Sequence, residues 1–373
     1  ARIILTGAVV VGHVGTDMGL RSTYCVSASQ KGPILTFWMC HGSKIYRWCN
    51  PGFMAISGFL CGRSVHEHGH VQGALMLPFV RIVRYYVRQV LHLLVSLCLC
   101  HVAVALEETG GTRINVDTLH LLEASKGHWL RDGFLMQGMF FQDFFLVRQG
   151  TGIRLLTIFQ SMWMLQVALL MPLSILSILS SYPFLVATAL TSIVVGFASV
   201  SLSHLHGREM LQLPLHGCLE LAPATAFGFL AGSACRAVHR ASASHLWTLS
   251  ALGAASAAMV LLPVLHSAAM IDGGLRADIP GAKALSLCEA KLPSAPILLF
   301  SLGFSLLLMV LTIVVPQGTR IPGVQMIARL SPGMMTNNFP LLVILHAVFH
   351  LHMPLERRGT TYMFSWAGIV WLA

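Results

Sequence analysis

Charged side chains are scarce in this sequence. Of its 373 residues, 24 are Lys or Arg and 14 are Asp or Glu, so charged residues make up 10% while hydrophobic residues make up 55%. Soluble domains carry about 25% charged residues, and this shortfall excludes an ordinary soluble protein. It predicts an all-α fold, a polytopic bundle of transmembrane helices whose partners are membrane lipids.

Several motifs are missing as well. The nine cysteines include no CxxC pair and no zinc-ligand spacing, no internal repeat is present, and the first apolar run lacks the cleavage site of a secretion signal. The net charge of +10 is scattered through loops, which favours anionic lipid headgroups or an anionic substrate over nucleic acid. Cys25, Cys40 and Cys49 share the first loop, and a disulfide within this group and three separate thiols both stay open.

The apolar runs predict about nine or ten membrane spans, since each crossing needs roughly 20 apolar residues. The clearest predicted spans are 158–180, 183–203, 245–270 and 293–316. Further spans are predicted at 3–20, 50–62 with its flanks, 85–106, 219–238 and 339–353, and a tenth begins near 360. Because the sequence starts at Ala1 and ends inside an apolar run, we expect 1–373 to be one membrane-embedded domain truncated at both ends.

Two polar connections separate these runs. Residues 107–153 are predicted to hold an interfacial amphipathic helix around GFLMQGMFFQDFFL. The Gly/Ala-rich linker 271–291 is predicted to be an exposed loop. Orientation stays undecided, because the flanking segments 15–50 and 62–90 each carry four Lys or Arg residues.

The first span carries an unusual set of ionisable residues. Arg2 and His13 are eleven residues apart, about three helical turns or ~16 Å of rise, and therefore lie on one helical face. Asp17 follows His13 by four residues, so its carboxylate can hydrogen-bond the imidazole and raise its basicity. This pattern suits a general base, although a histidine paired with a backbone carbonyl gives the same sequence.

A stripe of arginines precedes the span at 85–106. Arg81, Arg84 and Arg88 occupy positions i, i+3 and i+7 of a predicted helix. Such a stripe can hold a phosphate or carboxylate through bidentate contacts. The alternative is a helix end whose arginines extend to the membrane surface.

Taken in order, these segments resemble the acyltransferase-3 family of membrane-bound O-acyltransferases. The resemblance rests on the Arg2 and His13 spacing and on five stretches: FMAISGFLCG (53–62), RIVRYY (81–86), SMWMLQVALLMPLSIL (161–176), LAPATAFGFLAGSA (221–234) and NFPLLVILHAVF (338–349). Each stretch is weak alone, but their order is kept across nearly the whole chain.

The resemblance implies a catalytic base at His13 with Arg2 as its essential partner. It implies that Arg81 and Arg84, in the stripe that also holds Arg88, bind acyl-CoA as co-substrate. No metal or haem is expected. Removing the proton of an attacking alcohol is work for a base, and arginines can stabilise the anionic donor without reacting.

The chain departs from the family pattern at two places. The carboxylate expected five residues after Trp163 is Ala168, and the tyrosine expected three residues before His346 is Val343. Asp17 can stand in for the missing carboxylate, which is an inference from spacing rather than from the family.

The 18 histidines exceed what the resemblance uses. HEHGH at 66–70 fits a metal site only if the segment is extended. His346 and His350 lie one helical turn apart, and a haem would need a matching histidine such as His92 or His101. Lone histidines near span ends, namely His204, His206 and His266, are predicted to be interfacial.

Three functions are compatible with these features. The first is acyl transfer from acyl-CoA to a hydroxyl of a carbohydrate or lipid. The second is a catalytically silent, acyltransferase-like subunit whose partners are other chains of a membrane complex. The third is a transporter. The acyl acceptor, the acyl length and the membrane are not specified by the sequence.

Overall fold

The computed structural model describes residues 4–9, 48–67, 157–205, 214–241, 246–272 and 282–315. These residues are helical apart from short turns, and no strand occurs among them. This confirms the all-α helical bundle. The chain divides into two compact units, one formed by 1–47, 85–160 and 322–373 and the other by 48–84 and 161–321.

The first unit is described over a short helical segment, residues 4–9. Leu5 and Val9 are buried on this segment while Ile4 is exposed. The segment agrees with the start of the predicted first span. The remainder of that span, the predicted spans 85–106 and 339–353, the run near 360 and the connection 107–153 lie outside the described residues.

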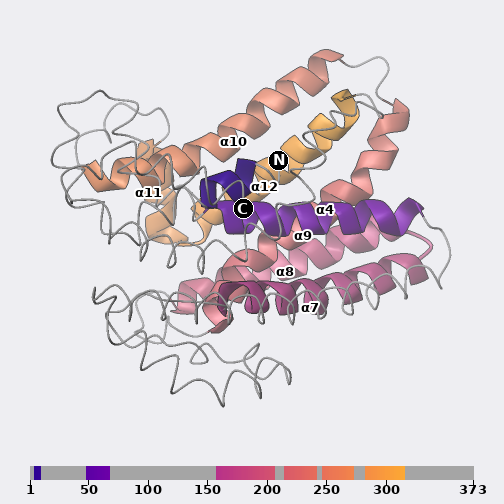
Figure 1. Cartoon of the computed structure of the whole chain (residues 1–373), viewed down its shortest axis with the longest axis horizontal. Helices are drawn as coiled ribbons and strands as arrows, with labels where there is room; N and C mark the ends of the chain where they lie inside the picture. Colours follow the sequence, from indigo (N-terminus) through magenta and orange to yellow (C-terminus); the bar gives the residue numbers. More distant parts are fainter. Residues whose placement is uncertain are drawn as a thin grey trace, which may run out of the picture. The chain divides into compact units, whose positions relative to one another are not determined.

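The second unit is the helical bundle shown in Figure 1. Its helices are α4 (Cys49–Glu67), α7 (Thr157–Leu179, whose first residues belong to the other unit), α8 (Pro183–Leu205), α9 (Pro214–Ala241), α10 (Leu246–Asp272), α11 (Ala282–Lys291) and α12 (Ala295–Val314). The four clearest predicted spans correspond to α7, α8, α10 and α12, with ends that differ by one or two residues. Long apolar runs therefore located these helices well.

Three of the helices are long and apolar enough to cross a membrane: Pro183–His204, Trp247–His266 and Ala295–Val314. In α7 and α9 the apolar stretches are shorter, Ala168–Leu179 and Leu219–Cys235. The total of nine or ten spans stays a prediction.

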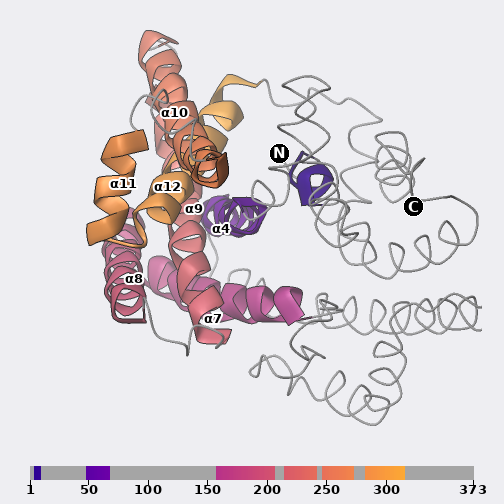
Figure 2. The same ribbon diagram turned by 90° about the vertical axis from the view of Figure 1, so that its left-hand side faces the viewer.

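Helix α9 is the centre of the bundle. It packs against α4, α8 and α12, and α12 also packs against α10 and α4. The two views agree, since α4 lies along α9 and α10 lies beside α12 in both Figure 1 and Figure 2. α7 joins through Leu170 and Leu173, which cluster with Cys61 of α4 and Phe229 of α9.

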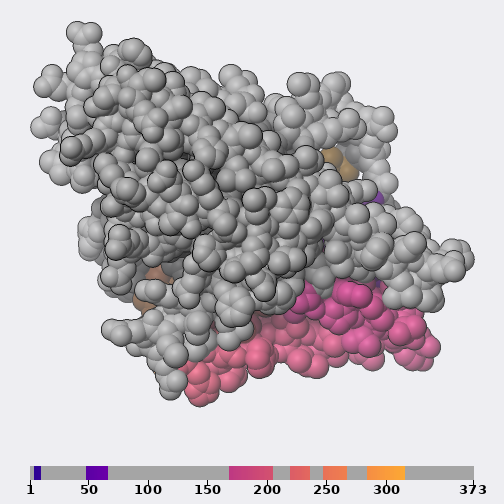
Figure 3. All heavy atoms as spheres, turned by 60° about the horizontal axis from the view of Figure 1, so that its bottom comes forward, coloured from indigo at the N-terminus to yellow at the C-terminus, as the bar shows by residue number. Residues whose placement is uncertain are grey.

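Over most of α8, small residues point inward and large apolar residues point outward, and Leu202 near its end is the large side chain that is buried. Ala187, Thr191 and Ala198 are buried, whereas Ile193 and Phe197 are 65% and 67% exposed. Figure 3 shows the outer surface of α7 and α8 as a continuous magenta to pink band. An apolar surface of this kind is typical of a helix that faces lipid.

The prediction of an exposed loop over 271–291 is wrong for its second half, which forms α11. The sequence AKALSLCEAK consists mainly of good helix formers, and this local propensity outweighs its polar composition. A tight turn at residues 292–294 follows, and Pro296 lies in the first turn of α12, where a proline removes no helical hydrogen bond. α11 therefore sits between the C-terminal end of α10 and the start of α12.

Candidate functional site

The residues predicted for acyl transfer all lie outside the part of the chain that the structure describes: Arg2, His13, Asp17, Arg81, Arg84 and Arg88. The same holds for Val343 and for the histidines of the haem alternative, His92, His101, His346 and His350. Their roles stay predictions.

Two of the stretches that carry the family resemblance do meet in the structure. FMAISGFLCG belongs to α4 and LAPATAFGFLAGSA belongs to α9, and the two helices pack along each other. Gly228 approaches Ala55 and Gly232 approaches Phe59, so the helices run in the same direction. Segments about 170 positions apart in the sequence thus form one helix pair.

Four glycines allow the close approach of this pair, which we call the α4–α9 glycine contact: Gly58, Gly62, Gly228 and Gly232. A Cβ atom built on Gly58 would lie 2.8 Å from the amide nitrogen of Phe229, and one on Gly232 would lie 2.9 Å from the amide nitrogen of Arg63. In each case a backbone carbonyl oxygen of the partner helix is closer still. Each helix thus offers a Gly-x-x-x-Gly pair, which is the arrangement that lets membrane helices touch backbone to backbone.

The position that lacks the family's carboxylate is also described. Ala168 lies on α7 and is exposed. Asp17, the predicted stand-in for this carboxylate, lies outside the described residues.

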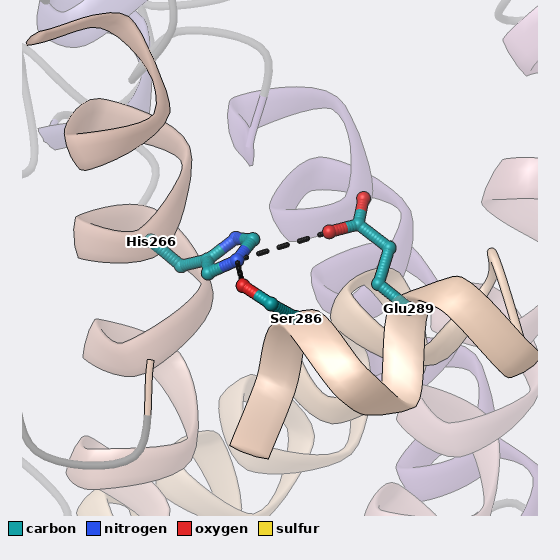
Figure 4. Close-up of polar contacts among 3 residues, drawn as sticks. All are labelled: His266, Ser286 and Glu289. Carbon is teal, nitrogen blue, oxygen red and sulfur yellow. Dashed lines mark hydrogen bonds and ion pairs between the residues drawn. The ribbon is translucent and has the colours of Figure 1, made fainter. Parts of the chain in front are cut away.

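A polar cluster that connects α10 to α11 is shown in Figure 4. His266, on α10, is buried with 4% of its surface exposed. Its Nε2 atom lies 2.9 Å from Oγ of Ser286 and 3.8 Å from Oε2 of Glu289. Ser286 and Glu289 lie three residues apart on α11 and therefore face the same way.

This cluster contains the residue types of a serine-nucleophile site, but its geometry is different. In a Ser-His-acid triad the serine and the acid contact opposite nitrogens of the imidazole, so that the acid orients the ring while the serine is activated. Here both partners approach Nε2. The arrangement therefore favours a structural clasp, in which one histidine holds α11 against the end of α10.

The sequence indicated only that His266 lies near a span end, and interfacial placement was the expected reason. The structure instead buries the ring and gives it two polar partners. Ser286 and Glu289 at i and i+3 were a visible signal of a polar helix face, but the linker was predicted to be a loop. His204, by contrast, is exposed and lies in the last turn of α8, so its predicted position near a span end is confirmed.

Metal and thiol chemistry receive no support from the described residues. No group of three or more His, Cys, Asp or Glu among them is placed to hold a metal ion. His66 falls in the last turn of α4, so that part of HEHGH is helical rather than extended, while His68 and His70 lie outside the described ranges. Cys49 is a buried thiol without a disulfide, which leaves Cys25 and Cys40 as the candidates for a pair.

Comparison with known proteins adds no family. No protein-family model, no curated protein and no solved structure matches this chain.

Proposed function

We propose that this chain is a multi-pass membrane protein with an acyltransferase-3-like domain that moves an acyl group from acyl-CoA to a hydroxyl of a carbohydrate or lipid. The observation that supports the proposal is the α4–α9 glycine contact. It joins two of the stretches on which the resemblance rests, and it gives their glycines a physical role.

Membrane placement is supported by lengths and by exposed aromatic side chains. The 22 residues of Pro183–His204 extend about 33 Å as a helix, and the hydrocarbon core is about 30 Å thick. Tyr182 directly precedes the apolar stretch of α8 and is 72% exposed. Trp247 is the first residue of the apolar stretch of α10 and is 90% exposed. Aromatic residues at such positions are typical of the membrane interface.

In the proposed reaction the acceptor hydroxyl attacks the thioester carbonyl of acyl-CoA. His13 removes the hydroxyl proton, and Arg2 with the Arg81 and Arg84 pair stabilises the anionic donor and the oxyanion. The carbon–sulfur bond then breaks, and the CoA thiolate leaves with a proton from the histidine.

The test is an acyl-transfer assay on the full chain in lipid nanodiscs. Radiolabelled acetyl-CoA and palmitoyl-CoA are supplied with lipid and carbohydrate acceptors, and labelled ester is measured. We expect His13→Ala to lower the rate by about 10²–10⁴-fold, the contribution of a general base. His204→Ala is the matched control, because His204 is exposed at the end of α8 and should leave the rate unchanged. A wild-type chain that forms no ester with any acceptor argues against the enzyme.

The second candidate is a catalytically silent subunit of a membrane complex. It is favoured by Ala168, where the family has a carboxylate. In that case other chains should cover the apolar surface of α7 and α8 (Figure 3). Extraction in mild detergent followed by size-exclusion chromatography separates the two candidates. A silent subunit should elute as part of a larger complex, whereas an enzyme should elute alone and retain labelled acyl-CoA.

A further inference from the structure

Helix α11 is fixed to both of its neighbours at the places where their apolar stretches end. The apolar stretch of α10 ends at His266, and Nε2 of this residue lies 2.9 Å from Oγ of Ser286 in the middle of α11. The apolar stretch of α12 begins at Ala295, shortly after α11 ends at Lys291. Two separate connections therefore hold α11 at the level where α10 and α12 leave their apolar parts.

The turn from α11 to α12 is too short to carry α11 away from this level. The amide of Leu292 donates to the carbonyl oxygen of Cys288 at 2.7 Å, and the amide of Ala295 donates to that of Leu292 at 2.9 Å. Even a fully extended stretch of four residues would reach at most ~14 Å, and this turn is folded. The headgroup layer on each side of the hydrocarbon core is roughly 5–8 Å deep. If α10 and α12 cross a membrane, α11 therefore lies at its headgroup layer.

The direction of α11 also suits the surface of a membrane. In Figure 2, α4 is seen nearly along its axis, whereas α11 is seen from the side. α11 thus runs across the bundle rather than along it, and it packs on α10 and α12 where the two helices meet it. A helix in this orientation can lie in the plane of the membrane interface.

The two sides of α11 differ in charge. Leu285 is buried, and Glu289 lies on the side of α10, with Oε2 3.8 Å from Nε2 of His266. The outer side carries Leu287, which is 69% exposed, and Lys291, which is also exposed. Leu287 and Lys291 are one helical turn apart and lie about 40° from each other around the helix. The acidic side chain is thus drawn toward α10, while the basic one stays on the outer side beside a large apolar side chain.

We propose that the outer side of α11, formed by Leu287 and Lys291, binds the surface of an anionic lipid bilayer. An apolar side chain beside a basic one is the pattern of helices that lie in the membrane interface. Leu287 enters the acyl region, and the stem of Lys291 lies along it while the ammonium group contacts lipid phosphates. The proposal rests on the membrane placement of α10 and α12 but not on acyl transfer.

The experiment is photo-crosslinking of the full chain in nanodiscs that contain equal amounts of phosphatidylglycerol and phosphatidylcholine. The photoreactive amino acid p-benzoylphenylalanine is incorporated in place of Leu287, and mass spectrometry identifies the adducts. We expect lipid adducts in which phosphatidylglycerol exceeds phosphatidylcholine by about fivefold, the factor for one lysine near an anionic surface.

Two variants test the role of the lysine. Lys291→Gln should bring the ratio of the two lipids close to one, because the positive charge is removed. Lys291→Arg should keep the ratio high, because the charge is preserved. The ratio compares two lipids on the same protein, so it does not depend on how much of each variant folds.

Ile193 provides the matched control position. It is 65% exposed on the apolar outer surface of α8, so p-benzoylphenylalanine in its place should form lipid adducts without a preference for either headgroup. This control tests membrane placement separately from the role of α11.

Three outcomes overturn the proposal. Lipid adducts at position 193 with none at position 287 show that α11 lies away from the bilayer, while the membrane placement stands. A lipid ratio near one at position 287, or a high ratio that Lys291→Gln leaves unchanged, shows that the lysine does not recognise anionic headgroups. The absence of lipid adducts at both positions refutes the membrane placement and the role of α11 together.

Discussion

The α4–α9 glycine contact makes a sharp prediction about Gly62→Ala. The substitution adds one carbon atom to α4 at a point where the backbone of α9 lies very close. That atom would lie 2.9 Å from the carbonyl carbon of Phe229, 3.0 Å from Oγ of Ser233 and closer still to the Phe229 carbonyl oxygen. The atoms it meets are mostly backbone, which cannot rotate away. The helices must therefore separate.

The size of the effect follows from two opposing contributions. Non-bonded carbon atoms rest about 3.5–4.0 Å apart, so relief requires a separation of roughly 1 Å. Overpacking of this kind destabilises a protein by about 1–3 kcal/mol. Alanine also favours the helix over glycine by about 1 kcal/mol, which offsets part of that loss.

The variant Gly196→Ala separates the steric loss from the gain in helix propensity. Gly196 lies on α8, and a Cβ atom there would meet nothing within 4 Å. The helix preference of alanine is common to both variants, so the difference between them isolates the steric effect. We expect Gly62→Ala to be less stable than Gly196→Ala by about 1–3 kcal/mol, measured by denaturant titration of the purified chain in mixed micelles.

A second substitution in the same contact tests whether the cause is helix separation. Once Gly62→Ala has moved the helices apart, Gly228→Ala meets Ala55 less closely, so the double variant should lose less than the sum of the two single variants. Equal stabilities of Gly62→Ala and Gly196→Ala would refute the close contact. Additive losses would refute its cooperative origin.

Two further predictions concern the other end of the bundle and the α10–α12 contact. His266→Ala should expose α11 to faster hydrogen exchange, because it removes the hydrogen bond to Ser286, worth about 0.5–1.5 kcal/mol; unchanged exchange would contradict the clasp. Gly303→Ala should destabilise the protein, since its Cβ would lie 2.5 Å from Cβ of Met259. Gly253→Ala is the control on α10, because the nearest atom to its Cβ would be 3.5 Å away. If Gly303→Ala is as stable as Gly253→Ala or more stable, the close packing of α10 against α12 is refuted.

The sequence located the helices because a long apolar run is a local property. The predicted spans 183–203 and 293–316 match α8 and α12 within two residues. It did not locate α11, because a ten-residue polar helix between two spans looks like a loop in composition. The helix forms through local propensity and through contact with α10 and α12, and contact cannot be read from the linker itself.

The candidate site was predictable only in part for the same reason. Both glycine-rich stretches were singled out, since each is visible alone. Their pairing depends on the three-dimensional path of the chain, as does the approach of Ser286 to a histidine twenty residues earlier. The residues predicted for acyl transfer rest on spacing and resemblance, and they stay predictions.

The packing of this bundle reverses the usual relation between side-chain size and stability. Between helices in lipid there is little hydrophobic gain from burying a large side chain, because lipid tails are equally apolar. Several buried positions on α9 are accordingly small, such as Ala224, Ala226 and Gly228, beside the one large buried ring of Phe229. Phe197 and Ile193 of α8 point outward. Soluble cores are destabilised mainly by removing atoms, whereas the α4–α9 glycine contact should be destabilised mainly by adding them.

The small size of the buried residues also decides how buried polar groups are satisfied. A core of small residues offers few side-chain partners, so the hydroxyls bond mainly to backbone carbonyl oxygens. Ser256 donates to a carbonyl of its own helix, and Thr191 of α8 donates to the carbonyl oxygen of Ala226 on α9.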